Sequence, residues 1–344
     1  MNKNFRLSLC LAAGIMAAAC AKAPTTLTNG NERLSFESRA LVHYHDSIID
    51  TTAFGVFIIN DIKGRGEAVA DTNYLFVRYI CRNMVTGEIL EYTDAEQARQ
   101  LGTYQKYNYY SDRILPYREG TTVKGLMELV TGGKRTGKMY VGGTRSALIP
   151  GWLLSTAVYP DVQGYMNNVT GQADYEYTLT VNGQTPDITR WQIDTIRRYM
   201  EKMHLEGHSK SGEGFFYCRT KDPAKETKLP TDTTVYINYT GRLLNGQVFD
   251  TTVKDTAKVW GIYSESSSYA PVSVSTAADS TAYTMSSSSV IKGFSLTVHN
   301  MHPGEKGVGI FTSDYGYGTS ASGSKIPPYA PLVFEIELVP NPTL

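Results

Sequence analysis

The chain has 344 residues, and its 33 lysines and arginines match its 33 aspartates and glutamates, so the formal net charge is +0. A neutral chain argues against nucleic acid or a strongly charged substrate as a partner, because binding to either depends on a field of one sign. An apolar content of 41% is ordinary for a soluble core, and the length suggests two domains.

Residues 1–34 have the composition of an export segment followed by a tether. A positively charged head precedes an apolar run at 7–19 that is too short to span a bilayer, which predicts a signal peptide over 1–19. Ala17-Ala18-Ala19-Cys20 resembles a bacterial lipobox, in which the cysteine thiol carries a diacylglycerol. A signal peptide cleaved without lipid attachment is the alternative. With residues 20–34 as a flexible tether, we expect a lipid-anchored cell-envelope protein that faces the periplasm.

The rest of the chain contains two copies of one unit. Each copy has a predicted helix, three strand-like runs, a short segment around a Lys-Gly pair and a closing strand. In order, these landmarks are 36–50, 55–59, 74–79, 86–91, 123–126 and 175–181 in the first copy, and 188–204, 214–217, 234–239, 245–250, 291–294 and 333–339 in the second. This predicts an α+β protein with two domains, 35–186 and 211–344, joined by a helical linker at 187–210.

Within the second copy, the pattern predicts a sheet with one short helix packed across it. Residues 235–239 are apolar and aromatic, a turn with Gly246 at its permissive position follows, and 332–338 alternate as a half-buried strand should. We expect the serines at 286–289 to cap a helix that begins near Val290 and ends near Asn300. Cys81 and Cys218 lie on strand-like runs in different copies and are expected to be buried free thiols.

Six motifs follow one another in the second copy. They are Tyr-Thr-Gly at 239–241, Asn-Gly-Gln-Val-Phe-Asp at 245–250, Val-Ile-Lys-Gly-Phe at 290–294, Pro-Gly-Glu-Lys at 303–306, Asp-Tyr-Gly-Tyr-Gly at 314–318, and Ile-Pro-Pro at 326–328 with the strand that follows it. In this order they resemble the FKBP family of peptidyl-prolyl cis/trans isomerases. The resemblance implies, for each copy, a half-barrel antiparallel sheet wrapped on a short helix, and for the second copy a shallow apolar pocket that holds a proline ring.

The resemblance also assigns site residues. The pocket would be lined by Tyr239, Phe249, Val290, Ile291, Phe294, Ile326 and Phe334, with Asp250 and Tyr317 as polar groups at the rim. Tyr317 and the backbone N–H of Ile291 would donate hydrogen bonds to substrate carbonyls. Rotation about an X-Pro bond faces a barrier of roughly 18–20 kcal/mol, which a site lowers by binding the twisted amide better than either planar form. That chemistry requires no metal or cofactor, and we expect none.

The sequence departs from the family pattern in several places. Phe294 stands where the family usually has Trp, and no histidine occurs in the loop at 319–324. A long Ser/Thr-rich insertion separates Asp250 from Val290, with Thr281 or Tyr283 near the place of a pocket Phe. We expect either a solvated loop or a flap that helps to hold an unfolded client.

The first copy has lost most of the predicted pocket. Leu90 and Glu91 replace the Phe-Asp pair, and Leu126 replaces the aromatic floor. We therefore expect the first copy not to isomerise, and to serve as a scaffold that dimerises or positions the second copy.

The leading functional hypothesis is an envelope foldase that isomerises X-Pro bonds in exported polypeptides. The alternatives are a non-catalytic peptide-binding chaperone or scaffold lipoprotein, and a structural part of an envelope complex. Expected partners are proline-containing unfolded chains and, through the N-terminal lipid alone, a membrane. Nucleic acid is not an expected partner, and a homodimer is left open.

Overall fold

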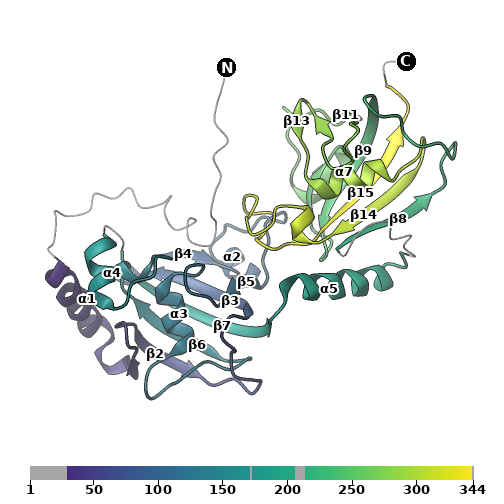
Figure 1. Cartoon of the computed structure of the whole chain (residues 1–344). Coiled ribbons are helices and arrows are strands. Elements are labelled where there is room, and N and C mark those ends of the chain that lie inside the picture. Colours follow the sequence, from purple (N-terminus) through teal and green to yellow (C-terminus); the bar gives the residue numbers. More distant parts are fainter. Residues whose placement is uncertain (1–28, 171–172, 206–213, 343–344) are drawn as a thin grey trace. The chain divides into compact units, whose positions relative to one another are not determined.

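The computed structural model describes residues 29–170, 173–205 and 214–342, so the predicted signal peptide and Cys20 lie outside the described residues. The chain divides into two compact units, one containing the residues up to Thr103 together with Tyr110–Asp187, the other Tyr104–Tyr109 together with the residues from Ile188 onward. Each unit has one antiparallel sheet with helices packed on it (Figure 1). The predicted α+β class with two antiparallel sheets is confirmed. Among the described residues, no helix is long and apolar enough to cross a bilayer.

The first unit is built around a seven-stranded sheet. Its elements are α1 (Asn29–Tyr44), η1 (His45–Ser47), β1 (Asp50–Thr51), β2 (Phe57–Ile62), β3 (Tyr74–Asn83), β4 (Ile89–Tyr92), α2 (Ala95–Gln100), β5 (Arg113–Pro116), α3 (Lys124–Thr131), β6 (Thr144–Ile149), η2 (Gly151–Leu153), α4 (Val162–Asn168) and β7 (Tyr175–Thr185). The strand order is β1-β2-β6-β7-β3-β4, and β5 also pairs with β3. Leu126, Leu129 and Val130 of α3 are buried in its core.

The second unit contains an eight-stranded sheet. Its elements are α5 (Ile188–Lys202), β8 (Phe215–Lys221), β9 (Thr234–Leu243), β10 (Val248–Thr251), α6 (Lys254–Trp260), β11 (Val272–Ser275), β12 (Thr284–Met285), β13 (Ser288–Ser289), α7 (Lys292–His299), β14 (Lys306–Phe311), η3 (Ser313–Tyr315) and β15 (Leu332–Val339). The order is β13-β12-β11-β9-β15-β14-β8, and β10 also pairs with β9. Phe294, Leu296 and Val298 of α7 pack against the inner face of the sheet.

The two sheets share one topology. The order β2-β6-β7-β3 in the first unit corresponds to β8-β14-β15-β9 in the second, and β4 pairs with β3 as β10 pairs with β9. Each sheet also has one short helix across it, α3 and α7, and both helices span eight residues. The duplication predicted from the sequence is therefore confirmed at the level of strand order.

Helix α5 packs on the outer face of the second sheet. Ile196 of α5 is fully buried in a cluster with Val308, Ile310 and Val333. The buried amide of Gln192 accepts a hydrogen bond from the Ser313 backbone N–H at 2.7 Å and donates one to its hydroxyl at 3.0 Å. Over Ile188–Lys202, the predicted linker is thus a packed part of the second unit.

Three local predictions were wrong. Helix α1 begins at Asn29, inside the predicted tether, because Phe36 and Ala40 bury one of its faces and an Arg33–Glu37 ion pair supports its exposed side. The serines at 286–289 do not cap a helix. Ser286 and Ser287 have positive φ and form the two-residue turn between β12 and β13, while α7 begins at Lys292 without a side-chain cap.

The third correction concerns the insertion between Asp250 and Val290, which is not a plain solvated loop. It contains α6 and three short strands, of which β11 pairs with β9 along Val272–Ser275. Val274 and Tyr283 are buried in the main core. The insertion therefore extends the sheet beyond β9. That it acts as a flap stays a prediction.

Candidate active site

Four aromatic side chains from four different elements meet on the inner face of the second sheet. Tyr239 comes from β9, Phe249 from β10, Phe294 from α7 and Phe334 from β15. The ring centroid of Phe334 lies 6.2 Å from that of Tyr239, 5.6 Å from that of Phe249 and 5.2 Å from that of Phe294. None of the four is more than 8% exposed. Edge-to-face contacts of this kind hold rings at fixed angles, so the arrangement is an ordered apolar wall.

Gly241 allows this close packing. A Cβ at this position would lie 2.5 Å from the Phe249 ring and 3.1 Å from that of Phe334. Glycine in the Tyr-Thr-Gly motif is therefore required by the close approach of the two rings.

A polar pair borders the aromatic wall. The Tyr239 hydroxyl donates a hydrogen bond of 2.6 Å to Asp250, whose residue is exposed. Burial and the neighbouring Asp250 carboxylate raise the pKa of Tyr239 above its usual value. The phenol therefore stays protonated through the physiological range and holds Asp250 at the edge of the aromatic cluster.

Tyr317 lies at the same rim and is 38% exposed. Burial of its phenol and the charge of Asp250 raise its pKa, and a hydrogen bond with Ser322 opposes this shift. A protonated, partly exposed hydroxyl of this kind can donate to a carbonyl. Its predicted role toward substrate stays a prediction.

The structure brings the remaining predicted residues to the same place. Ile326 is 3% exposed and belongs to the same cluster as the four rings, and Val290 and Ile291 pack against that cluster. The buried Pro327 and Pro328 follow Ile326 directly. All nine residues assigned from the motifs are thus gathered in the aromatic cluster or at its polar edge.

Sequence reasoning missed three neighbours of the site. Phe311 of β14 stacks on Phe334 with centroids 5.9 Å apart, and Lys325 Nζ donates to the Phe249 carbonyl at 3.2 Å. Gln247 Nε2 also reaches the Lys325 carbonyl, at 3.3 Å. Gln247 belongs to the motif at 245–250 and Lys325 directly precedes Ile326, so their position in the sequence was an available signal. Of the two residues expected near the place of the family's additional pocket Phe, Tyr283 is buried in the core. Its hydroxyl lies 3.0 Å from His299 Nδ1.

The first unit keeps half of this arrangement. Cys81 on β3 pairs with Glu91 and Tyr177, as Gly241 on β9 pairs with Asp250 and Phe334. The Tyr79 hydroxyl donates to Glu91 at 2.5 Å, in the place of the Tyr239–Asp250 bond. Leu90, however, is 42% exposed where its counterpart Phe249 is 6% exposed. The polar pair is retained and the aromatic wall is absent at this place in the first unit.

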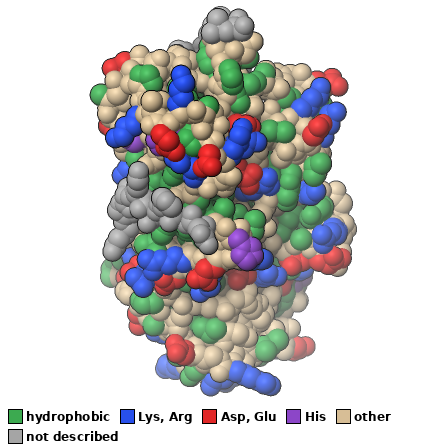
Figure 2. All heavy atoms as spheres, turned by 90° about the vertical axis from the view of Figure 1, so that its right-hand side faces the viewer, with side chains coloured by type: hydrophobic (Ala, Val, Ile, Leu, Met, Phe, Trp, Pro, Cys, Tyr) green, Lys and Arg blue, Asp and Glu red, His purple; other side chains and the backbone are tan. Residues whose placement is uncertain are grey.

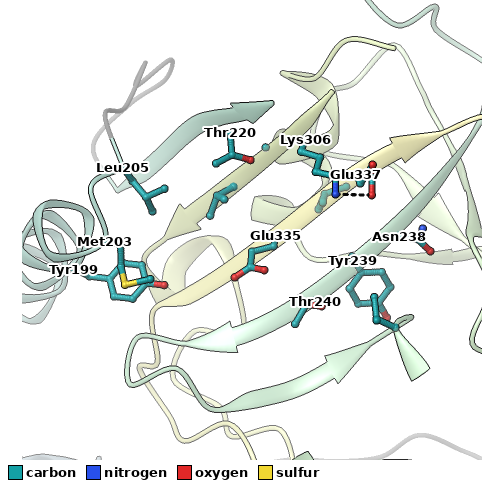
Figure 3. Close-up of a pocket in the computed structure, with 14 residues that line it drawn as sticks. Tyr199, Met203, Leu205, Thr220, Asn238, Tyr239, Thr240, Lys306, Glu335 and Glu337 are labelled. Atoms are coloured by element: carbon teal, nitrogen blue, oxygen red, sulfur yellow. Dashed lines mark ion pairs between the residues drawn. The ribbon is translucent and has the colours of Figure 1, made fainter. Parts of the chain in front are cut away.

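A separate hollow of about 350 Å³ lies on the opposite face of the second sheet (Figure 3). Tyr199 and Met203 lie side by side at one end, and the Lys306–Glu337 ion pair of 3.0 Å lies at the other. Tyr239 is shared between its lining and the predicted site. On the face shown in Figure 2, acidic and basic side chains are mixed, in keeping with the neutral net charge.

Comparison with known proteins finds relatives of the second unit. The family model described as FKBP-type peptidyl-prolyl cis-trans isomerase matches residues 225–339. FK506-binding protein 1 of Dictyostelium discoideum is 31% identical over 110 residues, which are 32% of this chain and 82% of that protein. FK506-binding protein 1A of Aspergillus fumigatus is 33% identical over 105 residues, 30% of this chain and 74% of that protein.

Among solved structures, a peptidyl-prolyl cis-trans isomerase from Pseudomonas syringae pv. tomato is 25% identical, with coverage of 45% of this chain and 97% of that one and a TM-score of 0.30. The sequence relatives, matched over most of their own length, settle the family. The chain belongs to the FKBP-type peptidyl-prolyl cis-trans isomerases.

Proposed function

We propose that the second unit isomerises X-Pro bonds of exported polypeptides during folding, by binding the twisted amide in the aromatic pocket. The observation that carries the proposal is the meeting of Tyr239, Phe249, Phe294 and Phe334 beside an exposed carboxylate. This combination offers a water-poor surface for a proline ring and a polar edge for the peptide that flanks it. Rotation of the amide needs no nucleophile and no proton transfer.

The groups of the proposed site have different roles, which follow from their positions. The rings exclude water from the amide, which favours the twisted form because its carbonyl and nitrogen are less conjugated and less polar than in the planar amide. Asp250, held by Tyr239, lies where it can face the rotating carbonyl group, and Tyr317 is placed to donate to a neighbouring substrate carbonyl. Preorganised polar groups of this kind cost little reorganisation during the reaction.

The location of the substrates follows from the N-terminal segment. The lipobox-like sequence ending in Cys20 supports attachment to an envelope membrane on the periplasmic face, where newly exported chains fold. We propose that the first unit is a scaffold without turnover. The loss of the Phe249 counterpart supports that role, since the fold and the Tyr79–Glu91 pair are retained.

A protease-coupled assay on Ala-Xaa-Pro-Phe peptides tests the proposal. The purified chain should accelerate cis-to-trans conversion in proportion to its concentration, and Phe249→Ala should remove most of that acceleration. No acceleration by the well-folded wild-type chain would sink the proposal. Aggregation suppression measured on the same two proteins examines the chaperone alternative. Suppression by the wild-type chain without any turnover would favour a non-catalytic binding module.

A further inference from the structure

The loop that leads into Ile326 has little in its own sequence to fix its position. Residues 319–325 read Thr-Ser-Ala-Ser-Gly-Ser-Lys, and those at 319, 320, 323 and 324 are exposed. Short polar side chains offer little apolar surface to bury, and Gly/Ser-rich sequence is flexible unless other contacts restrain it. Backbone hydrogen bonds of 2.9 and 3.3 Å between Ser322 and Ile326 close a small turn within the loop. The loop therefore depends on neighbouring segments to hold it.

A segment from the first half of the sequence lies against this loop. Tyr104–Tyr109 is placed between α2 and β5 in sequence and belongs to the second unit in space. The Tyr109 N–H donates to the Ser324 carbonyl at 3.0 Å, and the Ser324 hydroxyl donates to the Asn108 side chain at 2.5 Å. Tyr109 also packs against the hydrophobic core cluster of the second unit. The exposed loop is thus joined to a segment that is itself packed on the core.

Gln247 connects this segment with the loop. It is 4% exposed, and its Nε2 donates to the Tyr107 carbonyl at 2.5 Å and to the Lys325 carbonyl at 3.3 Å. Lys325 Nζ in turn donates to the Phe249 carbonyl at 3.2 Å and lies 5.4 Å from the centre of the Tyr107 ring. Gln247 and Lys325 therefore tie the chain just before Ile326 to the strand that carries Phe249.

The start of the segment is fixed to α6. Lys106 Nζ donates to the Val259 carbonyl at 2.9 Å and lies 4.6 Å from the centre of the Trp260 ring system. With Lys106 on α6 and Tyr109 on the core, the segment is held at both ends. A segment held in this way restrains the loop that is hydrogen-bonded to it.

We propose that Tyr104–Tyr109 is a brace that holds Ile326 against the aromatic rings, and that Gln247 is its positioning residue. The inference rests on the proposed function of the site. Without the brace, the loop spends part of its time away from the rings, and substrate binds only the fraction of molecules in which this wall is complete. The first half of the sequence thus contributes to catalysis in the second unit by positioning Ile326, without a group of its own that touches substrate.

Two changes in the full chain test the brace. Gln247→Met keeps the approximate size of the side chain and removes its donor, and a Gly-Ser linker of equal length in place of 104–109 removes the whole segment. Hydrogen exchange of the amides in 319–329, followed by mass spectrometry, should become about threefold to tenfold faster with Gln247→Met and at least as fast with the linker. The reason is that a lost hydrogen bond raises the population of the open loop by about this factor.

Thr276→Val is the matched control. Thr276 is 4% exposed, and its hydroxyl donates to the Pro230 carbonyl at 2.9 Å in the same unit. The substitution therefore removes a buried side chain to backbone hydrogen bond of similar kind, outside the loop and the brace. Exchange at 319–329 should stay as in the wild-type chain.

Steady-state kinetics distinguish a brace from a support of the fold. On Ala-Xaa-Pro-Phe peptides, Gln247→Met should raise KM about threefold to tenfold and leave kcat unchanged, because saturating substrate selects the molecules whose wall is in place. The rise should be the same with Leu or Gly as Xaa. A partly unfolded variant would instead show a lower kcat at an unchanged KM. Thr276→Val should change neither constant.

Other results overturn the brace. Unchanged exchange at 319–329 in both variants would show that the segment does not restrain the loop. An unchanged KM, with or without a fall in kcat, would show that Gln247 has no positioning role at the site, and a lower KM would show that the segment covers the site. If the wild-type chain turns over no peptide, the proposed function fails on its own. Hydrogen exchange then decides: faster exchange at 319–329 supports the brace, and unchanged exchange refutes it.

Discussion

The two units place a tyrosine and a carboxylate at the same points of the same sheet, yet they differ beside that pair. In the second unit, Gly241 leaves room for the Phe249 ring, to which a Cβ would approach within 2.5 Å. In the first unit, the corresponding residue is Cys81, which is buried and whose side chain occupies that space. The counterpart of Phe249 in the first unit, Leu90, is exposed. The exchange of Gly241 for Cys81 is therefore one of several differences that go with the loss of the aromatic wall on a shared sheet.

A second difference lies deeper in the two cores. Arg145 of β6 is 1% exposed, donates to the Leu129 carbonyl at 2.9 Å and pairs with Asp61 at 2.8 Å. Its counterpart in the second unit is Gly307, where a Cβ would meet the Tyr217 hydroxyl. The Tyr217 hydroxyl donates a hydrogen bond to the buried Glu305, so each unit has a different buried polar contact at this place.

The largest expected effect comes from breaking the network of the first unit. Asp61→Ala leaves Arg145 buried without its carboxylate, and we expect the free energy of unfolding of that unit to fall by about 3–5 kcal/mol. Urea unfolding followed by circular dichroism measures it. Asp71→Ala is the matched control, because its ion pair with Lys138 is exposed and should be worth about 0–1 kcal/mol. Equal effects of the two substitutions would contradict the stabilising role given to the buried Arg145–Asp61 ion pair.

The next largest effect separates the two sites by function. Phe249→Ala removes part of the aromatic wall worth about 2–3 kcal/mol of apolar contact, so kcat/KM on proline peptides should fall roughly 30-fold to 160-fold. Leu90→Ala, at the equivalent position, should leave kcat/KM unchanged. A similar loss in both variants would show that the first unit also turns over substrate.

Gly241→Cys gives the second unit the residue of the first. The new side chain should displace the Phe249 ring and lower kcat/KM about tenfold, in the range of an overpacking strain. Near-ultraviolet circular dichroism should report the altered aromatic packing. An active Gly241→Cys enzyme would mean that the contact between this position and Phe249 does not explain the difference between the units.

The smallest effect concerns the two buried thiols, one in each unit. Burial raises the pKa of Cys81 to about 12 and that of Cys218 to about 11, above the usual value of 9.0. Each thiol keeps its proton to a higher pH in the folded unit than in the unfolded chain. Its contribution to the free energy of unfolding is therefore fully present below pH 9 and is lost as pH rises through these values. Each unit should lose about 1.4 kcal/mol between pH 8 and 10. Cys81→Ala and Cys218→Ala should each reduce the slope of the free energy of unfolding against pH in their own unit. Unchanged slopes would refute the role given to the buried thiols.

The sequence was informative where residue types repeat in a fixed order. The nine residues assigned from the motifs of the second copy lie in the aromatic cluster or at its polar edge, and the matched landmarks predicted the shared strand order. Local patterns failed where tertiary context decides. The turn at Ser286–Ser287 has no Asn-Gly signal. Strand β11 is stabilised by pairing with β9 rather than by its own serine-rich composition, and β12 and β13 are added to β11 in turn. The grouping of Tyr104–Tyr109 with the second unit depends on contacts that are remote in sequence.

The ends of the second sheet decide how readily a foreign strand could pair with it. One boundary strand is the two-residue β13, formed by exposed serines, and the other is β8, which ends in the exposed Arg219, Thr220 and Lys221. Short and charged borders offer a poor template for backbone pairing with a foreign strand. An extended polypeptide is therefore discouraged from joining the sheet at these borders and nucleating an aggregate.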